Sequence, residues 1–473
     1  RAGFADALDA ARREAEASFG DGRVLLERYV ARPRHIEVQV LADHFGNAVA
    51  LGERECSIQR RYQKLIEESP SPAVDPPLRQ AMSDAALRLV RAAGYTNAGT
   101  VEFLLDENRS FAFLEVNARL QVEHPVTEAL TGLDLVEQQL RVASGDRLSF
   151  SQADVELRGH AIEARVVAED PAAGFLPSTG RLEVFEPPAG LRVDSSVEAG
   201  SFVSPYYDSL LAKVIAFGED RLTALRRLSD GLAEMMVEGV ASNLDLLLAT
   251  VEHPAFVAGE LRTGFLAEHG LVESLSEVPP EVAAAAAAVE VLRRHDASGD
   301  PWRTGGAWRL GRLEQPSRLL VAGSTAEVFV TRDLCDEQSV VRVGDRRMAL
   351  DAVTDHGVRI GSELAEVRPR SVVWRGRTYR VRPAPGLQIE QLAHHGSGGA
   401  AGGLTAPMPA RVVKLAVAEG EEVRANQPLV VLEAMKMEHV VEAPHAGVVR
   451  QLCVAAGQQV AAGALLLELA ELE

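Results

Sequence analysis

Five polar residues between positions 115 and 123 have side chains of the kind that bind metal ions and phosphates. They are Glu115, Asn117, Arg119, Gln121 and Glu123, with an apolar residue between each neighbouring pair. Alternate side chains of an extended chain point to the same face, so this spacing predicts a strand with one polar face. A solvated outer face would give the same alternation. Acids, an amide and a guanidinium together are typical of a site for a metal ion and an anion.

Another acidic residue, Glu102, lies on the preceding predicted strand. The segments Gly99–Leu105 and Ser110–Glu123 flank a turn, so we expect them to pair as a hairpin. That pairing would bring Glu102 close to Glu115. Mg²⁺ usually takes one or two carboxylates from a protein and keeps water and nucleotide phosphates as its other ligands. Glu102 and Glu115, with Asn117 beside them, therefore predict a site for Mg²⁺ and a nucleotide.

A lysine near the C-terminus, Lys436, lies between two copies of one repeat. The segment 406–429 recurs at 443–466 without gaps, at a constant offset of 37 residues, so that Ala406 returns as Ala443. Each copy contains short Val- and Leu-rich runs broken at Gly, which predicts two similar half-barrels folded against each other. Lys436 would then lie at the tip of the hairpin that joins them, where it could carry a covalent group between sites. The alternative is an ordinary solvated lysine in a turn.

The residues around this lysine, Ala434-Met435-Lys436-Met437, resemble the biotinyl (biotin carboxyl carrier) domain. The resemblance implies an all-β flattened hammerhead barrel, biotin attached to Lys436 and a biotin protein ligase as a partner. Lipoyl domains share the frame but usually carry Asp-Lys-Ala, which is absent here.

Length and composition narrow the remaining possibilities. A chain of 473 residues should hold about three domains. The formal net charge of −19 argues against nucleic acid and anionic membranes as partners. Cys56, Cys335 and Cys453 are far apart and indicate neither a disulfide framework nor a zinc site, so we expect a reducing, cytoplasmic location. No apolar run is long enough to predict a transmembrane helix.

The first part of the chain, about residues 1–271, resembles biotin carboxylase, an ATP-grasp enzyme. The motifs that carry the resemblance, in family order, are 27–30, 33–35, 56–64, 99–103, 115–125, 158–171, 175–178, 206–209 and 238–243. They imply an α+β fold and an ATP-dependent C–N ligase. Such an enzyme activates bicarbonate with ATP and transfers the carboxyl group to biotin.

The resemblance also assigns roles to single residues. The ligands of Mg²⁺ (or Mn²⁺) would be Glu102, Glu115 and Asn117. The ATP-binding residues would be Glu27, Arg28, Tyr29, Val30, His35, Gln59, Glu102 and Glu115. Bicarbonate and biotin would be bound by Lys64, Arg119, Gln121, Val122 and Arg165. The catalytic residues would be Lys64, Arg119, Glu123 and Arg165.

Two of these roles are chemical. Glu123 would be the general base that removes the proton of bicarbonate, and the neighbouring Arg119 would keep its carboxylate ionised. Arg165 would stabilise the oxyanion of deprotonated biotin.

The middle of the chain shows no cluster of residues suited to catalysis. Pro279-Pro280 before the Ala283–Ala288 run predicts the start of a helix, and 308–382 is rich in strand-forming residues. This β-rich segment with its preceding helix resembles the domain through which acyl-CoA carboxylase subunits dock a carboxyltransferase β subunit. We therefore expect a hetero-oligomer. The segment is too short for a carboxyltransferase domain, which argues against pyruvate carboxylase.

The expected organisation is α+β and multidomain. Its parts are a remnant of the ATP-grasp lid domain (1–30), the biotin carboxylase portion (31–271), a subunit-docking domain (272–395), a Gly/Ser/Ala linker (396–404) and the biotinyl domain (405–473). The family has a further N-terminal domain and a glycine-rich loop that closes over ATP, and neither precedes Arg1. We therefore expect an N-terminally truncated chain with weak or no catalysis of its own.

Four local elements are predicted in the first hundred residues. Ala7–Ala17 and Leu78–Ala93 have helical periodicity, and Val24–Val30 and His35–Ala42 have the composition of strands.

The function predicted from these features is that of the biotin carboxylase and biotin carrier subunit of an acyl-CoA carboxylase, of the acetyl-, propionyl- or methylcrotonyl-CoA type. One alternative is a carrier-only fragment with an inactive ATP-grasp scaffold. Another is a different biotin-dependent carboxylase. An unrelated ATP-grasp ligase with a lipoyl arm is disfavoured by Met435 and Met437.

Overall fold

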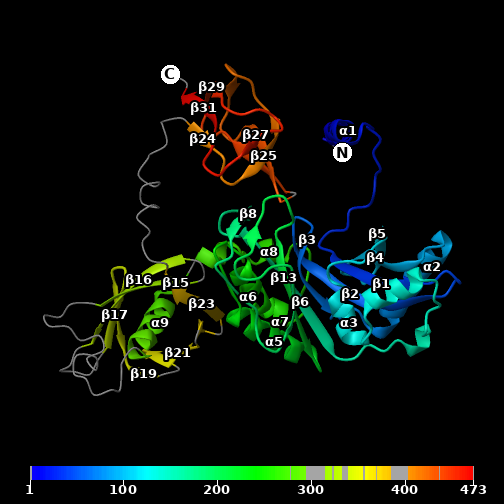
Figure 1. The fold of residues 1–473 in the computed structure, drawn as a ribbon, viewed down its shortest axis with the longest axis horizontal. Helices are drawn as coiled ribbons and strands as arrows, with labels where there is room; N and C mark the ends of the chain where they lie inside the picture. Colours follow the sequence, from blue (N-terminus) through cyan, green and yellow to red (C-terminus); the bar gives the residue numbers. More distant parts are fainter. Residues whose placement is uncertain are drawn as a thin grey trace.

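The chain folds into three groups of strands, each with its own hydrophobic core (Figure 1). The computed structural model describes residues 3–276, 278–293, 315–321, 324–332, 339–354, 357–368, 370–375, 377–384, 403–435 and 437–471. We call 34–276 the sheet domain, the described part of 278–384 the middle domain, and the described part of 403–471 the repeat domain. None of the described helices combines the length and the apolar composition that a membrane crossing requires.

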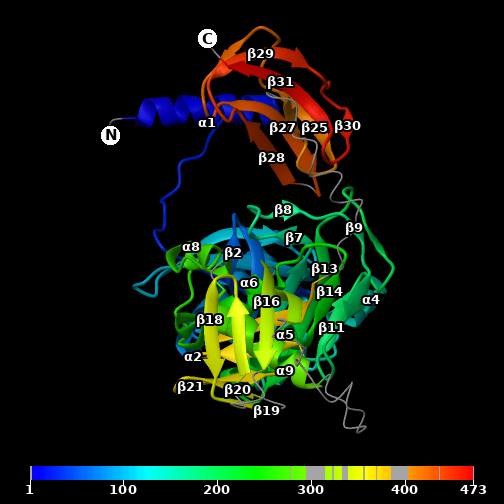
Figure 2. The ribbon, with the colours of Figure 1, turned by 90° about the vertical axis from the view of Figure 1, so that its left-hand side faces the viewer.

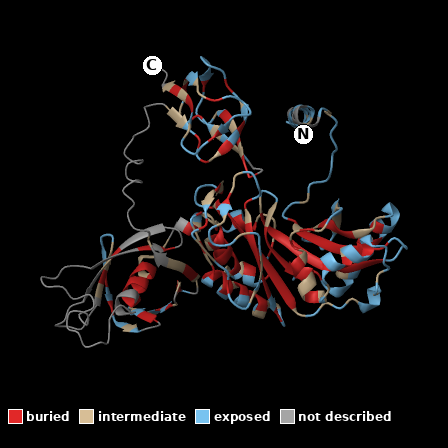
Figure 3. Cartoon of the chain, viewed as in Figure 1, coloured by how far each residue is buried: buried red, intermediate tan, exposed pale blue. Residues whose placement is uncertain are grey.

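The sheet domain is built on one eight-stranded sheet, in the order β11-β13-β6-β3-β2-β1-β4-β5. Neighbouring strands in this sheet are antiparallel. Its strands are β1 (Arg34–Ala42), β2 (Ala48–Arg60), β3 (Gln63–Ser69), β4 (Asn97–Leu105), β5 (Phe111–Asn117), β6 (His160–Val167), β11 (Arg192–Ser195) and β13 (Leu210–Gly218). The strands β1, β2 and β6 are buried along almost their whole length (Figure 3), so polar residues on them are removed from bulk water.

Helices cover this sheet and short strands extend it. The helices are α2 (Pro76–Ala93), α3 (His124–Thr131), α4 (Leu135–Ala143), α5 (Arg221–Glu234), α6 (Leu244–Val251), α7 (Pro254–Val257) and α8 (Phe265–Glu268), with 3₁₀ turns at Gln152–Asp154 and Glu273–Ser276. The short strands are β7 (Glu169–Asp170), β8 (Leu176–Pro177), β9 (Gly180–Arg181), β10 (Val184–Glu186), β12 (Phe202–Val203) and β14 (Met236–Glu238). The helix α2 packs on β1 and β2, and α5 packs on β13 and β6.

Three of the four predicted early elements are confirmed. Helix α1 (Phe4–Phe19) includes Ala7–Ala17, α2 includes Leu78–Ala93 and β1 includes His35–Ala42. The carboxylate of Asp75 caps α2 by accepting the Leu78 backbone N–H at 3.0 Å. The prediction of a strand at Val24–Val30 is wrong. That segment lies between α1 and the sheet (Figure 1) without a strand to pair with, and an extended chain without such a ladder is not a stable strand.

The predicted strand Ser110–Glu123 is too long. Strand β5 ends at Asn117, and the chain then turns into α3, which begins at His124 with Pro125 in its first turn. The backbone N–H groups of His124 and Val126 donate to the carbonyls of Gln121 and Glu123. Because Pro favours the first turn of a helix, the signal for α3 ends the extended conformation early.

The middle domain wraps a nine-stranded sheet around one helix, α9 (Pro280–Arg293) (Figure 1). Its strands are β15 (Gln315–Val321), β16 (Ser324–Arg332), β17 (Ser339–Val343), β18 (Arg346–Leu350), β19 (Ala352–Thr354), β20 (Gly357–Ile360), β21 (Glu363–Val367), β22 (Ser371–Trp374) and β23 (Arg377–Pro383). Every residue from Val282 to Val289 is buried, since the helix is enclosed by strands. Small alanine side chains let the strands approach it on all sides, which explains the Ala283–Ala288 run. The predicted helix is confirmed, and the β-rich segment is confirmed for those of its residues that the structure describes; 308–314 lie outside them.

The repeat domain consists of two four-stranded sheets, β24-β31-β29-β26 and β28-β27-β25-β30. Its strands are β24 (Gly403–Thr405), β25 (Ala410–Leu415), β26 (Glu422–Val423), β27 (Pro428–Ala434), β28 (Met437–Glu442), β29 (Gly447–Leu452), β30 (Gln459–Val460) and β31 (Leu465–Glu471). Strands β25, β26 and β27 recur 37 residues later as β29, β30 and β31, so the predicted duplication is confirmed. The predicted linker lies outside the described residues, except Gly403 and Leu404 at the start of β24.

Candidate active site

The eight-stranded sheet gathers three carboxylates around the ammonium group of Lys64 on β3. The Lys64 Nζ lies 2.5 Å from Glu37 Oε2 on β1, 2.6 Å from Glu123 Oε1 and 3.2 Å from Glu102 Oε1 on β4. Burial alone would lower the pKa of Lys64, but Glu37 and the other acidic groups outweigh it and raise that pKa. Lys64 is therefore a fixed cation at the centre of the site.

Two of these carboxylates are held in their charged form. Burial would raise the pKa of Glu37, but Arg54 and Lys64 together lower it to about 2. Burial would also raise the pKa of Glu102, while the hydrogen bond from His35 and the charge of Lys64 lower it to about 2. Both groups carry a negative charge near neutral pH, as buried acids do when they are well paired.

The predicted metal ligands Glu102, Glu115 and Asn117 converge at the β4–β5 edge of the sheet. Glu102 is directly opposite Glu115 in the ladder, as the sequence predicted. The Asn117 Nδ2 donates to Glu102 Oε1 at 2.8 Å and to Glu115 Oε1 at 3.3 Å, so both carboxylates lie within reach of one ion. Glu115 is exposed, which leaves this side open to a nucleotide. Two carboxylates with an open side fit Mg²⁺, whereas the Asn117 Oδ1 accepts from Arg119 here and would have to turn towards the carboxylates to act as a ligand.

The buried carboxylate of Glu123 bridges two cations. Its Oε1 accepts from Lys64, and its Oε2 accepts from Arg165 Nη2 at 2.9 Å. Arg165 is on β6, and burial alone would lower its pKa, but Glu67 and Glu123 raise it. Glu123 is 2% exposed, so it meets these cations with little screening by water. A carboxylate held this way can accept a proton from a substrate placed beside it.

The expectation that Arg119 holds Glu123 ionised is wrong. Arg119 is exposed, and its guanidinium donates to Asn117 Oδ1 at 3.3 Å and to the Leu120 carbonyl at 3.2 Å. Because β5 ends at Asn117, Arg119 and Glu123 are not alternate residues of one strand. The cations in contact with Glu123 are Lys64 and Arg165.

Gln121 and Val122 join the cluster through other contacts. The Gln121 Nε2 donates to Glu102 Oε1 at 2.7 Å, and its Oε1 accepts from Arg54 Nη2 at 2.9 Å. The Val122 carbonyl accepts from Lys213 Nζ at 2.8 Å. The turn before α3 is thus tied to the sheet from both sides.

The predicted nucleotide contacts fall into two groups. His35 and Gln59 lie on the sheet, His35 with its Nε2 2.6 Å from Glu102 Oε2 and Gln59 opposite Lys64 in the β2–β3 ladder. Glu27, Arg28, Tyr29 and Val30 lie in the segment between α1 and β1, and within the described residues none of their side chains is hydrogen-bonded to the cluster. The structure thus gathers the first group at the site and leaves the second outside it.

Arg54 and Glu37 are site residues that sequence reasoning missed. Arg54 is fully buried, and its guanidinium contacts Glu37 Oε1 at 2.5 Å and Gln39 Oε1 at 2.8 Å. A signal was present, because His35, Glu37 and Gln39 alternate with apolar residues on β1 in the same way as the polar residues after position 115.

The repeat domain meets the sheet domain through the hairpin of β27 and β28 (Figures 1 and 2). The backbone N–H of Met435 donates to the Pro205 carbonyl at 2.9 Å, and the Met435 side chain is part of the hydrophobic core of the sheet domain. In return, Leu176 of the sheet domain packs against the core of the repeat domain. Each domain thus contributes one apolar side chain to the core of the other.

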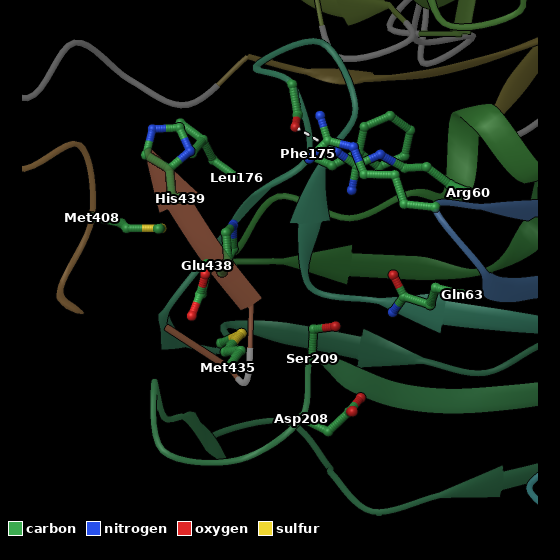
Figure 4. A pocket seen from close by; sticks show the side chains of 13 residues that line it. Arg60, Gln63, Phe175, Leu176, Asp208, Ser209, Met408, Met435, Glu438 and His439 are labelled. Atoms are coloured by element: carbon green, nitrogen blue, oxygen red, sulfur yellow. Dashed lines mark hydrogen bonds between the residues drawn. The ribbon is translucent and has the colours of Figure 1, made fainter. Parts of the chain in front are cut away.

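A cavity of about 370 Å³ lies between this hairpin and the sheet domain (Figure 4). Arg60, Phe175, Met435 and His439 are among its lining residues, and the Arg60 guanidinium is 3.8 Å from the centre of the Phe175 ring. Gln63, which also lines the cavity, directly precedes Lys64 on β3. The cavity therefore borders the strand that carries the central cation.

Lys436 itself lies outside the described residues. The strands on both sides of it are described, and Ala434 at the end of β27 is opposite Met437 at the start of β28. The predicted hairpin between the two copies of the repeat is confirmed.

Comparisons with known families match almost the whole chain. Residues 1–151 match the family described as carbamoyl-phosphate synthase L chain, ATP binding domain, and 163–268 match the biotin carboxylase C-terminal domain. Residues 279–393 match the BT domain of the methylcrotonyl-CoA carboxylase alpha subunit, and 403–469 match the family described as biotin-requiring enzyme.

Individual relatives agree with these matches. The propionyl-CoA carboxylase alpha chain of Ruegeria pomeroyi is 39% identical over 98% of this chain and 74% of its own length. The mouse mitochondrial methylcrotonoyl-CoA carboxylase subunit alpha is 36% identical over 99% of this chain and 69% of its own. A solved biotin carboxylase domain, from the 2-oxoglutarate carboxylase of Hydrogenobacter thermophilus in complex with MgADP, ADP and bicarbonate, is 42% identical with a TM-score of 0.55. The aligned region covers 57% of this chain and 60% of the solved chain.

Proposed function

The chain belongs to the family of biotin-dependent acyl-CoA carboxylase alpha subunits, and we propose that its sheet domain charges a biotin that the repeat domain carries on Lys436. Members of this family are ATP-dependent ligases that contain a biotin carboxylase and a biotin carrier domain in one chain. Their cofactors are biotin, ATP and Mg²⁺. The observation that carries the proposal is the buried Glu123 carboxylate between Lys64 and Arg165, next to a set of Mg²⁺ ligands.

The metal ligands in this proposal are Glu102, Glu115 and Asn117. Mg²⁺ bound there neutralises charge on the nucleotide phosphates. Glu102 has a second task, because it accepts from Lys64 at 3.2 Å and so ties the metal ligands to the centre of the site.

Bicarbonate is bound beside Lys64 and Arg165 in this proposal, because a small anion needs cationic donors in fixed positions. Glu123 lies between the two cations and accepts the proton of bicarbonate. Arg165 then faces the biotin ring and stabilises negative charge on its oxygen. The exposed Arg119 contacts the bicarbonate from the open side of the site.

The repeat domain is in a docked arrangement in this proposal. Met435, which directly precedes Lys436 in the sequence, contacts Pro205. This contact places the hairpin at the cavity beside β3. Biotin carried by this hairpin would reach the site from that cavity, which borders β3.

The proposal is tested with the complete subunit, biotinylated and incubated with MgATP and radioactive bicarbonate. Label should enter the protein only with MgATP, and it should be lost in Lys436→Ala and in Glu123→Gln. The matched control is Glu156→Gln, whose side chain is 65% exposed, and it should keep the label. Label that persists in Glu123→Gln would contradict the role of Glu123. Absence of both ATP binding and labelling in the wild type would favour the carrier-only alternative.

We also propose that the middle domain docks a carboxyltransferase β subunit in a hetero-oligomer, as its match to the BT domain suggests. Deletion of residues 278–385 should abolish co-purification with that subunit, whereas deletion of 405–473 should leave it intact. Loss of co-purification only in the second deletion would refute this.

A reducing compartment such as the cytoplasm suits the chain, because Cys56 is a buried free thiol.

A further inference from the structure

Two buried acidic residues close to Arg165 have no part in the reaction proposed above. Glu67 is on β3 and Glu163 is on β6, and they are directly opposite each other in the ladder. Both are fully buried. Side chains directly opposite on antiparallel strands have Cβ atoms about 4.5–5.5 Å apart, so the two side chains are neighbours on one face of the sheet.

Three oxygens of this pair have no hydrogen-bond partner. They are Glu67 Oε2, Glu163 Oε1 and Glu163 Oε2. The other oxygen of Glu67, Oε1, accepts from Arg165 Nε at 2.6 Å. Buried polar atoms without partners are costly and rare in folded proteins, so this group of orphans calls for a physical cause.

A single proton on the pair would give two of the three unpaired oxygens a hydrogen-bond partner. If Glu163 is a neutral carboxylic acid, its hydroxyl can donate to Glu67 Oε2, and one bond then pairs two of the orphan atoms. Two adjacent carboxylates that are excluded from water do not ionise together.

The surrounding charges agree with a single negative charge on the pair. The groups that face it are Arg165 on β6, Lys213 on β13, Lys64 on β3 and Glu123 before α3. Burial raises the pKa of Glu67 to about 7, with Arg165 opposing the rise and Glu123 adding to it. Burial raises the pKa of Glu163 well above its ordinary value, and the charge of Glu67 adds to that effect.

We propose that Glu163 keeps a proton that it shares with Glu67, and that this acid pair positions Arg165 for the carboxylation of biotin. The inference rests on the proposed function only for the role of Arg165. Arg165 contacts Glu67 through Nε and Nη2, and Glu123 through Nη2. With one charge on the pair, Glu67 fixes the guanidinium plane while Glu123 still holds its outer edge. A second charge on Glu163 would strengthen the pull away from Glu123.

The protonation is tested by infrared spectroscopy of the complete subunit in D₂O at neutral pD. The expected result is a carboxylic-acid C=O band that disappears in Glu163→Gln and shifts in Glu67→Gln, where the acceptor has changed. The matched control is Glu156→Gln, which removes an exposed acid and should leave the band in place. Absence of such a band in the wild type would overturn the shared proton, whether or not the subunit carboxylates biotin.

The positioning role is tested by kinetics of bicarbonate-dependent ATP cleavage. Glu67→Gln should lower kcat about 10- to 100-fold, the usual effect of losing a group that orients a functional side chain, and leave the KM for ATP unchanged. Glu163→Gln keeps a neutral donor of the same shape and should retain most of the wild-type kcat. An equal loss in both variants, or a change confined to KM, would overturn the positioning role.

Discussion

Lys64 is the residue on which most of the buried charge in the sheet domain depends. Three carboxylates share its ammonium group, and two of them, Glu37 and Glu123, are at most 2% exposed. An uncompensated charge in such a place costs several kcal/mol, so the carboxylates are stable as ions only while their cation is present. In the proposed function, Glu123 is also the group that accepts the proton of bicarbonate.

Replacing Lys64 with methionine should therefore destabilise the sheet domain strongly. Removal of one partner of a buried ion pair typically costs about 3–5 kcal/mol, because the other partner is left uncompensated. Urea unfolding of the complete subunit measures the change. The control is Arg158→Met, whose ion pair with Glu156 is exposed and whose loss should cost less than about 0.5 kcal/mol. Equal effects of the two substitutions would contradict the account.

Glu37 predicts how this stability depends on pH. Its folded pKa of about 2 is below its ordinary value of 4.5, so the stabilisation is present above pH 4.5 and is lost as the pH falls from 4.5 towards 2. The difference in unfolding free energy between wild type and Glu37→Gln should then be largest near pH 6 and shrink as the pH approaches 3. Denaturant curves across that range give the answer. A difference that grows on acidification would show that Glu37 is not held ionised.

At the scale of elements, the β27–β28 hairpin is the only part of the repeat domain for which a backbone hydrogen bond to the sheet domain is described. Met435 has a φ of 49°, a left-handed conformation that is uncommon for a residue other than glycine, asparagine or aspartate. Tight hairpin turns favour such a positive φ, while the N–H and side chain of Met435 both contact the sheet domain.

Loss of the apolar contact that Leu176 of the sheet domain makes with the repeat domain should release the hairpin. Leu176→Asp places a charge against the core of the repeat domain without altering the hairpin itself. Hydrogen exchange at the Met435 amide, which donates to Pro205, should become faster in this variant. The control is Leu140→Asp on α4, since Leu140 is already 66% exposed. Unchanged exchange in Leu176→Asp would mean that docking does not depend on this contact.

The burial of helix α9 leads to a prediction for the stability of the middle domain. Ala285 is fully buried among strands, so Ala285→Leu should overpack the core and lower the unfolding free energy by roughly 1–3 kcal/mol. Ala349→Leu, at an exposed position of β18, should have little effect on thermal unfolding. If both leucine variants are equally stable, α9 is not enclosed.

The elements that periodicity specifies were predicted from the sequence, and those that depend on long-range pairing were not. The repeat domain was predicted because each copy encodes the same strands, and β1, α2 and α9 because their patterns are strong. The contact of Glu123 with Lys64 and Arg165 was not predicted, because it joins residues 59 and 42 positions apart across a turn. Arg119 took their place in the prediction because it is the nearest cation in the sequence.

At the scale of the whole molecule, the middle domain and the repeat domain are attached to the sheet domain in different ways. The middle domain is joined by several polar contacts, among them Thr378 N–H to Glu252 Oε2 at 2.7 Å and Arg368 to Asp230 at 3.1 Å. The repeat domain is joined through Met435 and Leu176, beside the cavity of about 370 Å³. A firmly attached middle domain and a lightly held repeat domain suit the proposed function, in which the repeat domain must visit a second site.

The central claim is that Lys436 carries biotin, and the intact mass of the complete subunit tests it most directly. After co-expression with a biotin protein ligase, the account predicts a mass increase of one biotin in the wild type and none in Lys436→Ala. Wild-type protein without the increment, a lipoyl-sized increment, or an increment that survives in Lys436→Ala would contradict it.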